Sequence, residues 1–216
     1  MDKTIRIEGI GKVSAKPDLI RVTLGLSALD PDYGAAMDKA DENLAELRGL
    51  ATAAGLAKDA LKTCDFSVTS EYNSVKGDNG EYRREFVGYR CRHGLKAEFG
   101  FDTALLGKVL SEFAKSKAAP QLGVEFALRD ERAFAGEALA SAVADARFRA
   151  NAIATAAGLT LGDVLSIENR GNNGGFRSNT NVNFETRAVA LSAKCASFEP
   201  ENIDATDTVE VTFLVK

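Results

Sequence analysis

The sequence has 216 residues, and its 27 Lys and Arg against 31 Asp and Glu give a formal net charge of −4. This balance is atypical of nucleic-acid scaffolds and of polybasic membrane binders. Apolar residues make up 45% of the chain, which is ordinary for a folded domain, and no apolar run approaches the roughly 20 residues that span a bilayer. We expect a globular protein with no nucleic-acid partner and no membrane span.

The first segment, TIRIEGI, is strand-like and follows Met1 too closely to leave room for a signal peptide. We therefore expect a cytoplasmic protein, or a periplasmic or cell-envelope protein if an export signal has been removed. The next residues, GIGKVS at Gly9 to Ser14, resemble the start of a dinucleotide fingerprint. Because the third glycine is missing and Pro17-Asp18 follows where a helix should open, we expect a turn between strands.

The hexapeptide ATAAGL occurs twice, at residues 51–56 and 154–159, and matching elements precede both copies. Alternating apolar residues predict strands at Ile20 to Leu26 and at Leu122 to Leu128. A helix from about Pro31 to Ala54, capped by Asp30, precedes Gly55, and a helix capped by Asp130 precedes Gly158. We also expect an ion pair between Asp145 and Arg149.

Two further strands follow each long helix. LKTCDFSVTSEY and FVGYRCRHGLKAEF alternate in the first half, and DVLSIEN and RAVALSAKC alternate in the second. Alternation of this kind is typical of sheets that are buried on one face, so we expect an α+β protein with antiparallel sheets and helices packed on one face.

The chain is predicted to form one domain, residues 1–216, made of two duplicated strand-helix-strand-strand units. The first repeat covers approximately 15–100, the linking helix 101–117 with Asp102 as its cap, the second repeat 118–198, and the closing strand 206–216, which we expect beside the first strand.

Two polar segments occupy matching positions in the repeats, Asn73 to Arg84 and Asn169 to Asn183. They are either plain hairpin tips or contact arms. In the second case the aromatic and basic residues in or beside them, Tyr82, Arg84, Phe176 and Arg177, would suit a partner interface.

The solvent-facing side of the long strand carries Arg84, Arg90, Arg92 and Lys96, interrupted by Gly88 and Gly94. This basic face could receive an acidic partner surface, an anion or another subunit. The alternative is an ordinary solvated sheet face that is balanced by Asp65, Glu71 and Glu98.

His93 is the single histidine, and acid–base catalysis near neutral pH would depend on it. It alternates with Tyr89, Cys91 and Leu95 on an apolar face, so we expect a structural core residue. Cys64, Cys91 and Cys195 also fall on apolar faces and have no CxxC spacing, which indicates buried thiols and no metal or redox site. We predict no catalytic residue, cofactor or metal.

The ordered set GIGKVSAKPD, LKTCDFSVTSEY, GYR, ALASAVADARFRANAIATAAGLTLGDV and VEVTF resembles the SIMPL domain family over nearly the whole chain. That family includes bacterial envelope immunogens and proteins named for oxidative-stress defence. The resemblance implies a two-part α/β fold, no established enzymatic activity and a tendency to form homo-oligomers. We therefore expect a non-enzymatic, self-associating interaction protein or stress- or envelope-related scaffold, with an anionic-ligand binder or weak enzyme on the basic face as the alternative.

Overall fold

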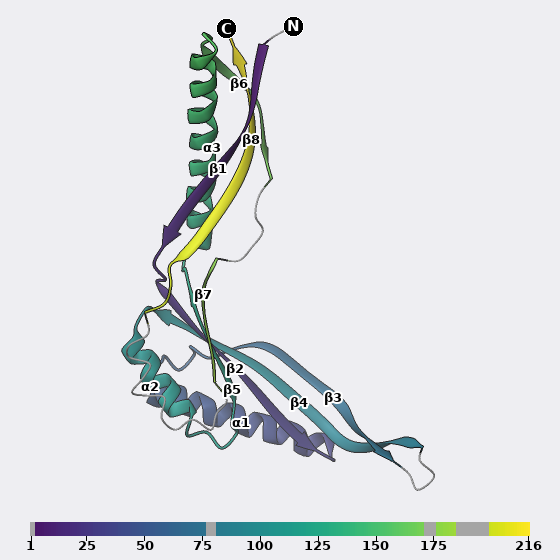
Figure 1. Ribbon diagram of the computed structural model, residues 1–216. Helices are drawn as coiled ribbons and strands as arrows, with labels where there is room; N and C mark the ends of the chain where they lie inside the picture. The colour runs from purple at the N-terminus through teal and green to yellow at the C-terminus, as the bar shows by residue number, and fades with distance from the viewer. Residues whose placement is uncertain (1–2, 77–80, 171–175, 185–198) are drawn as a thin grey trace. The chain divides into compact units, whose positions relative to one another are not determined.

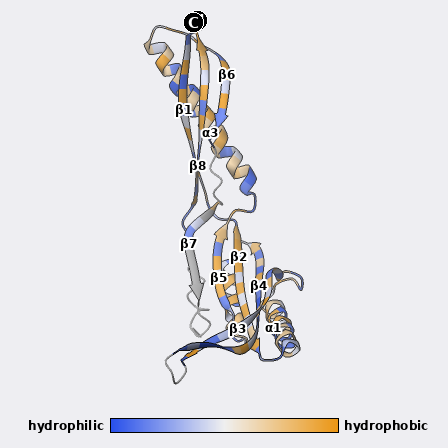
Figure 2. Ribbon diagram, turned by 90° about the vertical axis from the view of Figure 1, so that its right-hand side faces the viewer, coloured by the Kyte–Doolittle hydropathy of each residue, from blue (hydrophilic) through white to orange (hydrophobic). Residues whose placement is uncertain are grey.

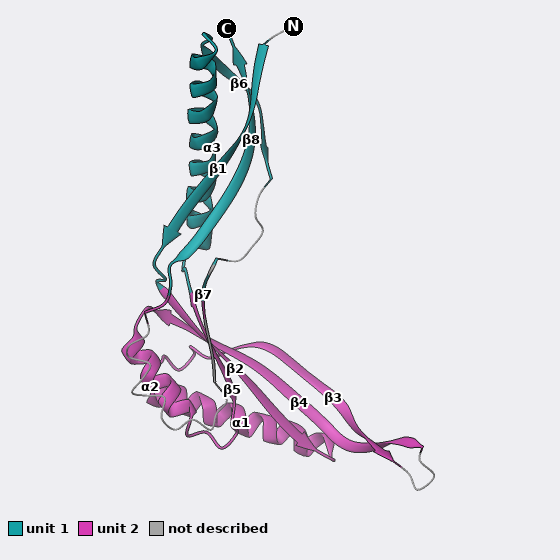
Figure 3. Cartoon of the chain, in the orientation of Figure 1, with its two compact units in different colours: residues 1–18, 127–179, 201–216 teal, residues 19–126, 180–200 magenta. Residues whose placement is uncertain are grey.

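The computed structural model describes residues 3–76, 81–170, 176–184 and 199–216 (Figure 1). Its elements in chain order are β1 (Lys3–Ala15), β2 (Leu19–Asp30), α1 (Tyr33–Ala53), β3 (Lys62–Lys76), β4 (Tyr82–Gly100), α2 (Thr103–Phe113), β5 (Gln121–Ala127), α3 (Glu131–Ala156), β6 (Leu161–Asn169), β7 (Arg177–Phe184) and β8 (Ile203–Val215). The chain divides into two compact units (Figure 3). Unit 1 comprises residues 1–18, 127–179 and 201–216, and unit 2 comprises residues 19–126 and 180–200.

Unit 1 contains a three-stranded sheet in the order β1-β8-β6, with both pairings antiparallel. The closing strand β8 pairs with β1 from Lys3–Val215 to Ala15–Ile203, which confirms the predicted neighbour. Helix α3 packs on this sheet, where Val209, Val211 and Phe213 of β8 meet its buried alanines. Apolar and polar residues alternate along the strands, as Figure 2 shows.

The contact between α3 and β1 is made by residues with almost no side chain. Five alanines at intervals of four residues form the buried stripe of α3: Ala138, Ala142, Ala146, Ala150 and Ala154. A Cβ on Gly9 would lie 2.2 Å from the Ala142 carbonyl oxygen, and one on Gly11 would lie 2.0 Å from that of Ala138. The predicted turn at Gly9 to Ser14 is therefore wrong, since these glycines lie inside β1 and allow the helix backbone to approach it.

Unit 2 contains a five-stranded sheet in the order β3-β4-β2-β5-β7. Helices α1 and α2 lie on one face of this sheet (Figure 1). Their apolar residues form a large cluster with β2, β4 and β5, and a smaller cluster in which Ala36 and Ala40 of α1 meet Ala28 and Cys91. The predicted alternation is confirmed by the burial of Ile20, Val22, Leu24 and Leu26, and of Leu122, Val124 and Phe126. The described part of the chain thus has three helices and two antiparallel sheets, the α+β class expected, and its element order is consistent with a duplication.

The predicted helix caps are confirmed with one exception. Asp102 and Asp130 accept backbone N–H bonds from Leu105 and Ala133. At α1, however, the cap is Asp32, which accepts from the Ala35 N–H, because β2 continues to Asp30. At the other ends, Gly55 and Gly158 take φ values of +102° and +72°, the left-handed conformation expected after a helix.

The first predicted polar loop is mostly strand. β3 continues to Lys76 and β4 begins at Tyr82, while β2 is paired with β4 no further than Tyr89. Residues Tyr72–Lys76 of β3 and Tyr82–Phe86 of β4 therefore form a two-stranded ribbon, called the arm below, that extends beyond the rest of the sheet (Figure 1). In the second predicted loop Arg177–Phe184 is β7, and the strand expected at RAVALSAKC lies outside the described residues.

No helix in the described part of the chain is both long and apolar enough to cross a membrane.

Candidate functional site

The face of the unit 2 sheet opposite its helices carries most of the predicted basic residues. Alternation along β4 places Arg90, Arg92, Gly94 and Lys96 on this polar face. Strand register then sets their neighbours. Arg92 lies between Ser27 of β2 and Ser67 of β3, and Gly94 lies between Gly25 of β2 and Asp65 of β3.

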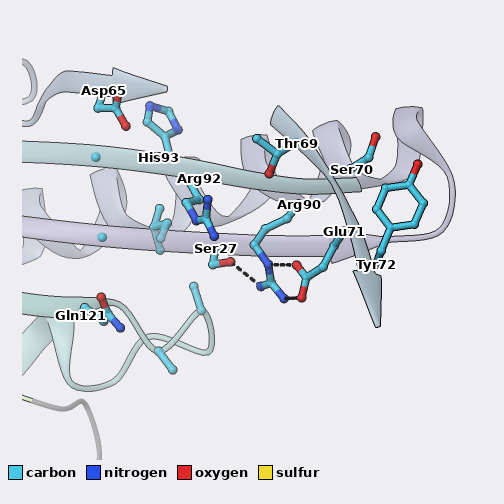
Figure 4. Close-up of a pocket in the computed structure, with 15 residues that line it drawn as sticks. Ser27, Asp65, Thr69, Ser70, Glu71, Tyr72, Arg90, Arg92, His93 and Gln121 are labelled. Atoms are coloured by element: carbon cyan, nitrogen blue, oxygen red, sulfur yellow. Dashed lines mark hydrogen bonds and ion pairs between the residues drawn. The ribbon is translucent and has the colours of Figure 1, made fainter. Parts of the chain in front are cut away.

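Arg90 is held in place by two neighbours on this face. Its guanidinium donates to both carboxylate oxygens of Glu71, with Nη2 at 2.8 Å from Oε1, and Nη1 donates to Ser27 Oγ at 2.9 Å (Figure 4). These hydrogen bonds from Arg90 lower the pKa of Glu71, and the carboxylate raises the pKa of Arg90. The charge of Arg90 is thus neutralised by Glu71, and its guanidinium is held in one orientation.

The basic residues near Glu98 on this face are also neutralised by ion pairs. Arg21 pairs with Glu98 at 2.6 Å and with Glu125 at 3.3 Å, and Lys96 pairs with Glu98 at 3.4 Å. The hydrogen bond from Arg21 lowers the pKa of Glu98. Among the described residues, Arg92 is the cation of this face that has no ion pair. The face is therefore closer to the balanced alternative than to a strongly basic surface.

A hollow of about 820 Å³ opens on the polar face, within the size range of small-molecule sites. Its lining includes Gly25 and Gly94 at the floor, with Asp65 and Gln121 on opposite sides of the two central strands (Figure 4). Ala119 lies on its rim with φ of +46°, the one positive φ among the described non-glycine residues. That conformation is strained for alanine.

His93 lies in the core, as predicted, with 7% of its surface exposed. Its Nε2 and Thr63 Oγ1 are 2.9 Å apart, and Phe66 meets the ring edge to face. The Nδ1 atom, however, has no hydrogen-bond partner among the described residues. Burial lowers the pKa of His93, followed by the charge of Arg48, so the imidazole is neutral at pH 7.

The cysteines differ from one another. Cys91 is buried against Met37, and burial raises the pKa of its thiol, as predicted. The predicted burial of Cys64 is wrong, because that residue is exposed. The strand register shifts between Thr63 and Asp65, so Cys64 is the additional residue of a β-bulge and leaves the apolar alternation of β3. Cys195 lies outside the described residues.

The other candidate interface residues are not brought to the hollow. Tyr82 and Arg84 lie on the arm, where the Arg84 guanidinium stands 4.6 Å from the centre of the Tyr72 ring. Phe176 belongs to unit 1 and packs edge to face on Phe134 at 5.4 Å. Arg177 begins β7, and its side chain lies outside the described part.

Sequence reasoning did not assign a role to Tyr72, Phe86 or Gln121, and it named Glu71 only as a charge that balances the basic face. Gln121 comes from β5, and only the strand order places it on the face of Arg92. Tyr72 and Phe86 are cross-strand partners in the arm. Their one sequence signal was an apolar alternation that continues past the end of the neighbouring strand β2.

The geometry defines an α+β protein with an aromatic arm and a polar hollow on the open face of a sheet. The family comparison agrees with the resemblance: the SIMPL family model, described as "Protein of unknown function (DUF541)", matches residues 5–213, and the chain belongs to this family. No curated protein matches the chain.

Proposed function

We propose that this SIMPL protein is a non-enzymatic interaction protein that self-associates through the arm of unit 2. The observation that carries the proposal is the exposure of three aromatic residues on a two-stranded ribbon. Tyr72 is 45% exposed, Phe86 44% and Tyr82 71%. Aromatic residues are enriched in the cores of protein interfaces, and Arg84 beside them fits that composition.

The stability of the ribbon supports the same role. A hairpin without a third strand or a covering helix is marginally stable in water. The arm has no third strand among the described residues, because β2 ends its pairing with β4 at Tyr89. A second copy packed on the arm would bury its aromatic rings and supply the missing cover.

Ring contacts inside the arm offer a competing explanation for two of these residues. Tyr72 meets Phe86 at 5.6 Å, and Phe86 meets Tyr89 at 5.3 Å, so both rings stabilise the hairpin itself. Tyr82 makes no ring contact within the described residues and is the most exposed of the three. It is therefore the residue that separates an interface from self-stabilisation.

The test is the mass of the protein in solution, measured by light scattering behind a sizing column over a range of concentrations. We expect wild-type protein to give a defined multiple of 23.0 kDa. Tyr82→Ser should weaken association by about tenfold or more, as for an interface aromatic residue.

The matched control is Phe148→Ser, which removes a 75% exposed aromatic ring from α3 of unit 1. This variant should keep the wild-type mass. A wild-type monomer at every concentration would refute the proposal, and equal dissociation of both variants would remove the arm as its interface.

A further inference from the structure

Two glycines form the floor of the hollow on the polar face, and packing accounts for only one of them. Gly25 and Gly94 are paired across β2 and β4, so two adjacent strands lack side chains at the same level. Gly94 is needed by the bulge, since a Cβ there would lie 3.1 Å from Asp65 Cβ and 3.3 Å from Cys64 Sγ. A Cβ on Gly25 would meet nothing closer than Gln121, at an ordinary 3.7 Å.

The space around Gly25 would thus accept an alanine side chain without a close contact. Glycine inside a strand loses backbone entropy and packs no side chain, and it often marks a bulge, a tight bend, or the close approach of a ligand or of another backbone. The register of β2 with β4 has no shift at Gly25. Here the space above Gly25 is the hollow.

Two opposite charges without an ion-pair partner among the described residues flank this floor, although the charge of Arg92 also acts on Glu71. Arg92 and Asp65 both line the hollow, and neither has an ion-pair partner among the described residues. They occupy diagonal positions on β4 and β3, which are typically about 7–8 Å apart, with a somewhat shorter distance between the Cβ atoms. The remaining lining charges, Arg90 and Glu71, neutralise each other.

The hydroxyl of Ser27 adds direction to the cationic side. Its oxygen accepts a hydrogen bond from Arg90, which leaves the Ser27 O–H free to donate to a ligand beside Arg92. On the other sides, Asp65 accepts hydrogen bonds from an ammonium group, and the Gln121 amide can donate or accept.

We propose that this hollow binds a small zwitterion, a free amino acid or a short peptide, whose carboxylate is held by Arg92 and Ser27 and whose ammonium is held by Asp65. The absent side chain at Gly25 lets the ligand lie against the sheet backbone. This site is distinct from the proposed arm interface, although Tyr72 of the arm is also among the residues that line the hollow.

Isothermal titration of the full chain with L-glutamine and with triglycine tests the proposal and separates its two ligand sources. Acetate, which has the carboxylate alone, and inorganic phosphate are the comparison probes. We expect one of the zwitterions to bind, and both comparison anions to bind at least about tenfold more weakly, because they lack the group that Asp65 recognises.

Three variants locate the site. Arg92→Gln and Gly25→Ala should each weaken binding by about tenfold or more, while the melting temperature of Gly25→Ala stays the same or rises. Lys96→Gln changes a cation on the same face that is paired with Glu98 and lies outside the hollow, and it should change affinity by less than about fivefold.

Three outcomes would overturn the proposal. The first is that neither zwitterion gives a binding heat. The second is that phosphate or acetate binds as tightly as the zwitterion, and the third is that binding survives both Arg92→Gln and Gly25→Ala. Tyr82 is not among the lining residues, so titration of Tyr82→Ser, whose hollow keeps its full lining, measures ligand binding separately from self-association.

Discussion

His93 shows how a single buried side chain couples the stability of unit 2 to pH. The ring is enclosed by Thr63 and Phe66, and the pKa is lowered because burial disfavours the charged form. Among the surrounding charges, Arg48 lowers this pKa further, whereas Asp41 and Asp65 oppose the shift. Protonation must therefore be easier in the unfolded chain than in the folded one.

The sign of the pH dependence follows from this difference. The unfolded chain takes up a proton as the pH falls below the ordinary histidine value near 6.5, while folded His93 stays neutral, so the folded state loses stability in that window. Glu71 and Glu98 have lowered pKa values, and their contributions are lost only at more acidic pH, below about 4.5.

We predict that the urea midpoint of the wild-type protein falls between about pH 8 and about pH 5, and that it falls less in His93→Gln, which has no titrating ring. Equal pH dependence in the two proteins would show that the imidazole does not control this loss.

For single residues, the sequence predicted burial correctly where a strand is regular, and less well where a strand is irregular. The apolar positions around Cys91 and His93 were enough to predict their burial, because neighbouring residues alternate regularly. Cys64 departs from the prediction because a one-residue bulge is invisible in the spacing of apolar residues. Asp30 and Asp32 are both good caps, and the choice between them depends on how far β2 continues.

At the scale of elements, the packing of β1 on α3 depends on the absence of side chains. The alanine stripe brings the helix backbone close to the strand, and Gly9 and Gly11 are the positions where it makes its closest approach. An added carbon at either position must shift the helix or the strand, because the clash is with backbone atoms and the packed interior yields little.

We predict that Gly11→Ala destabilises unit 1 by about 3 kcal/mol or more, through overpacking against Ala138 and Ala142. The matched control is Gly136→Ala on α3, where nothing lies within 4 Å of the new Cβ, and it should stabilise by about 0.5–1 kcal/mol. Denaturant unfolding of both variants measures the contrast, and a neutral Gly11→Ala would contradict the close approach.

Periodicity was sufficient to predict the helices, the strands and the one-sided burial of the sheets. Glycine was the weak point, because Gly9 and Gly11 have the same local appearance in a turn as in a strand that meets a helix backbone. For the candidate site, the basic positions of β4 could be predicted. Their neutralisation by Glu71 and Glu98 was one of the two alternatives, and the choice between these alternatives, like the pairing of Gly25 with Gly94, required the strand register.

At the scale of the whole molecule, each unit is assembled from separate stretches of chain and has its own apolar clusters. The clusters around Val211 and Phe134 consist of unit 1 residues, and those around Leu95 and Cys91 consist of unit 2 residues. A substitution that destabilises one core should therefore unfold the unit that contains it before it unfolds the other.

We predict that Val211→Asp, which buries an unpaired charge in unit 1 at a cost of several kcal/mol, exposes the amides of β1, β8 and α3 to hydrogen exchange. Amides of β2, β4 and α1 should keep their protection. The reciprocal variant, Leu95→Asp, should reverse this pattern. Simultaneous loss of protection in both units would show that they fold as one cooperative body.

The pairing of β1 with β8 also sets an order of events during synthesis on the ribosome. β1 is translated before every element of unit 2, and its partner is translated after all of them. At a translation rate of about 5–20 residues per second, β1 remains unpaired for on the order of ten seconds or more before β8 is synthesised. Its two interior glycines and its alternating charges, Arg6, Glu8 and Lys12, disfavour aggregation of an exposed strand. We therefore expect replacement of Arg6, Glu8 and Lys12 by apolar residues to increase aggregation of the nascent chain before β8 emerges.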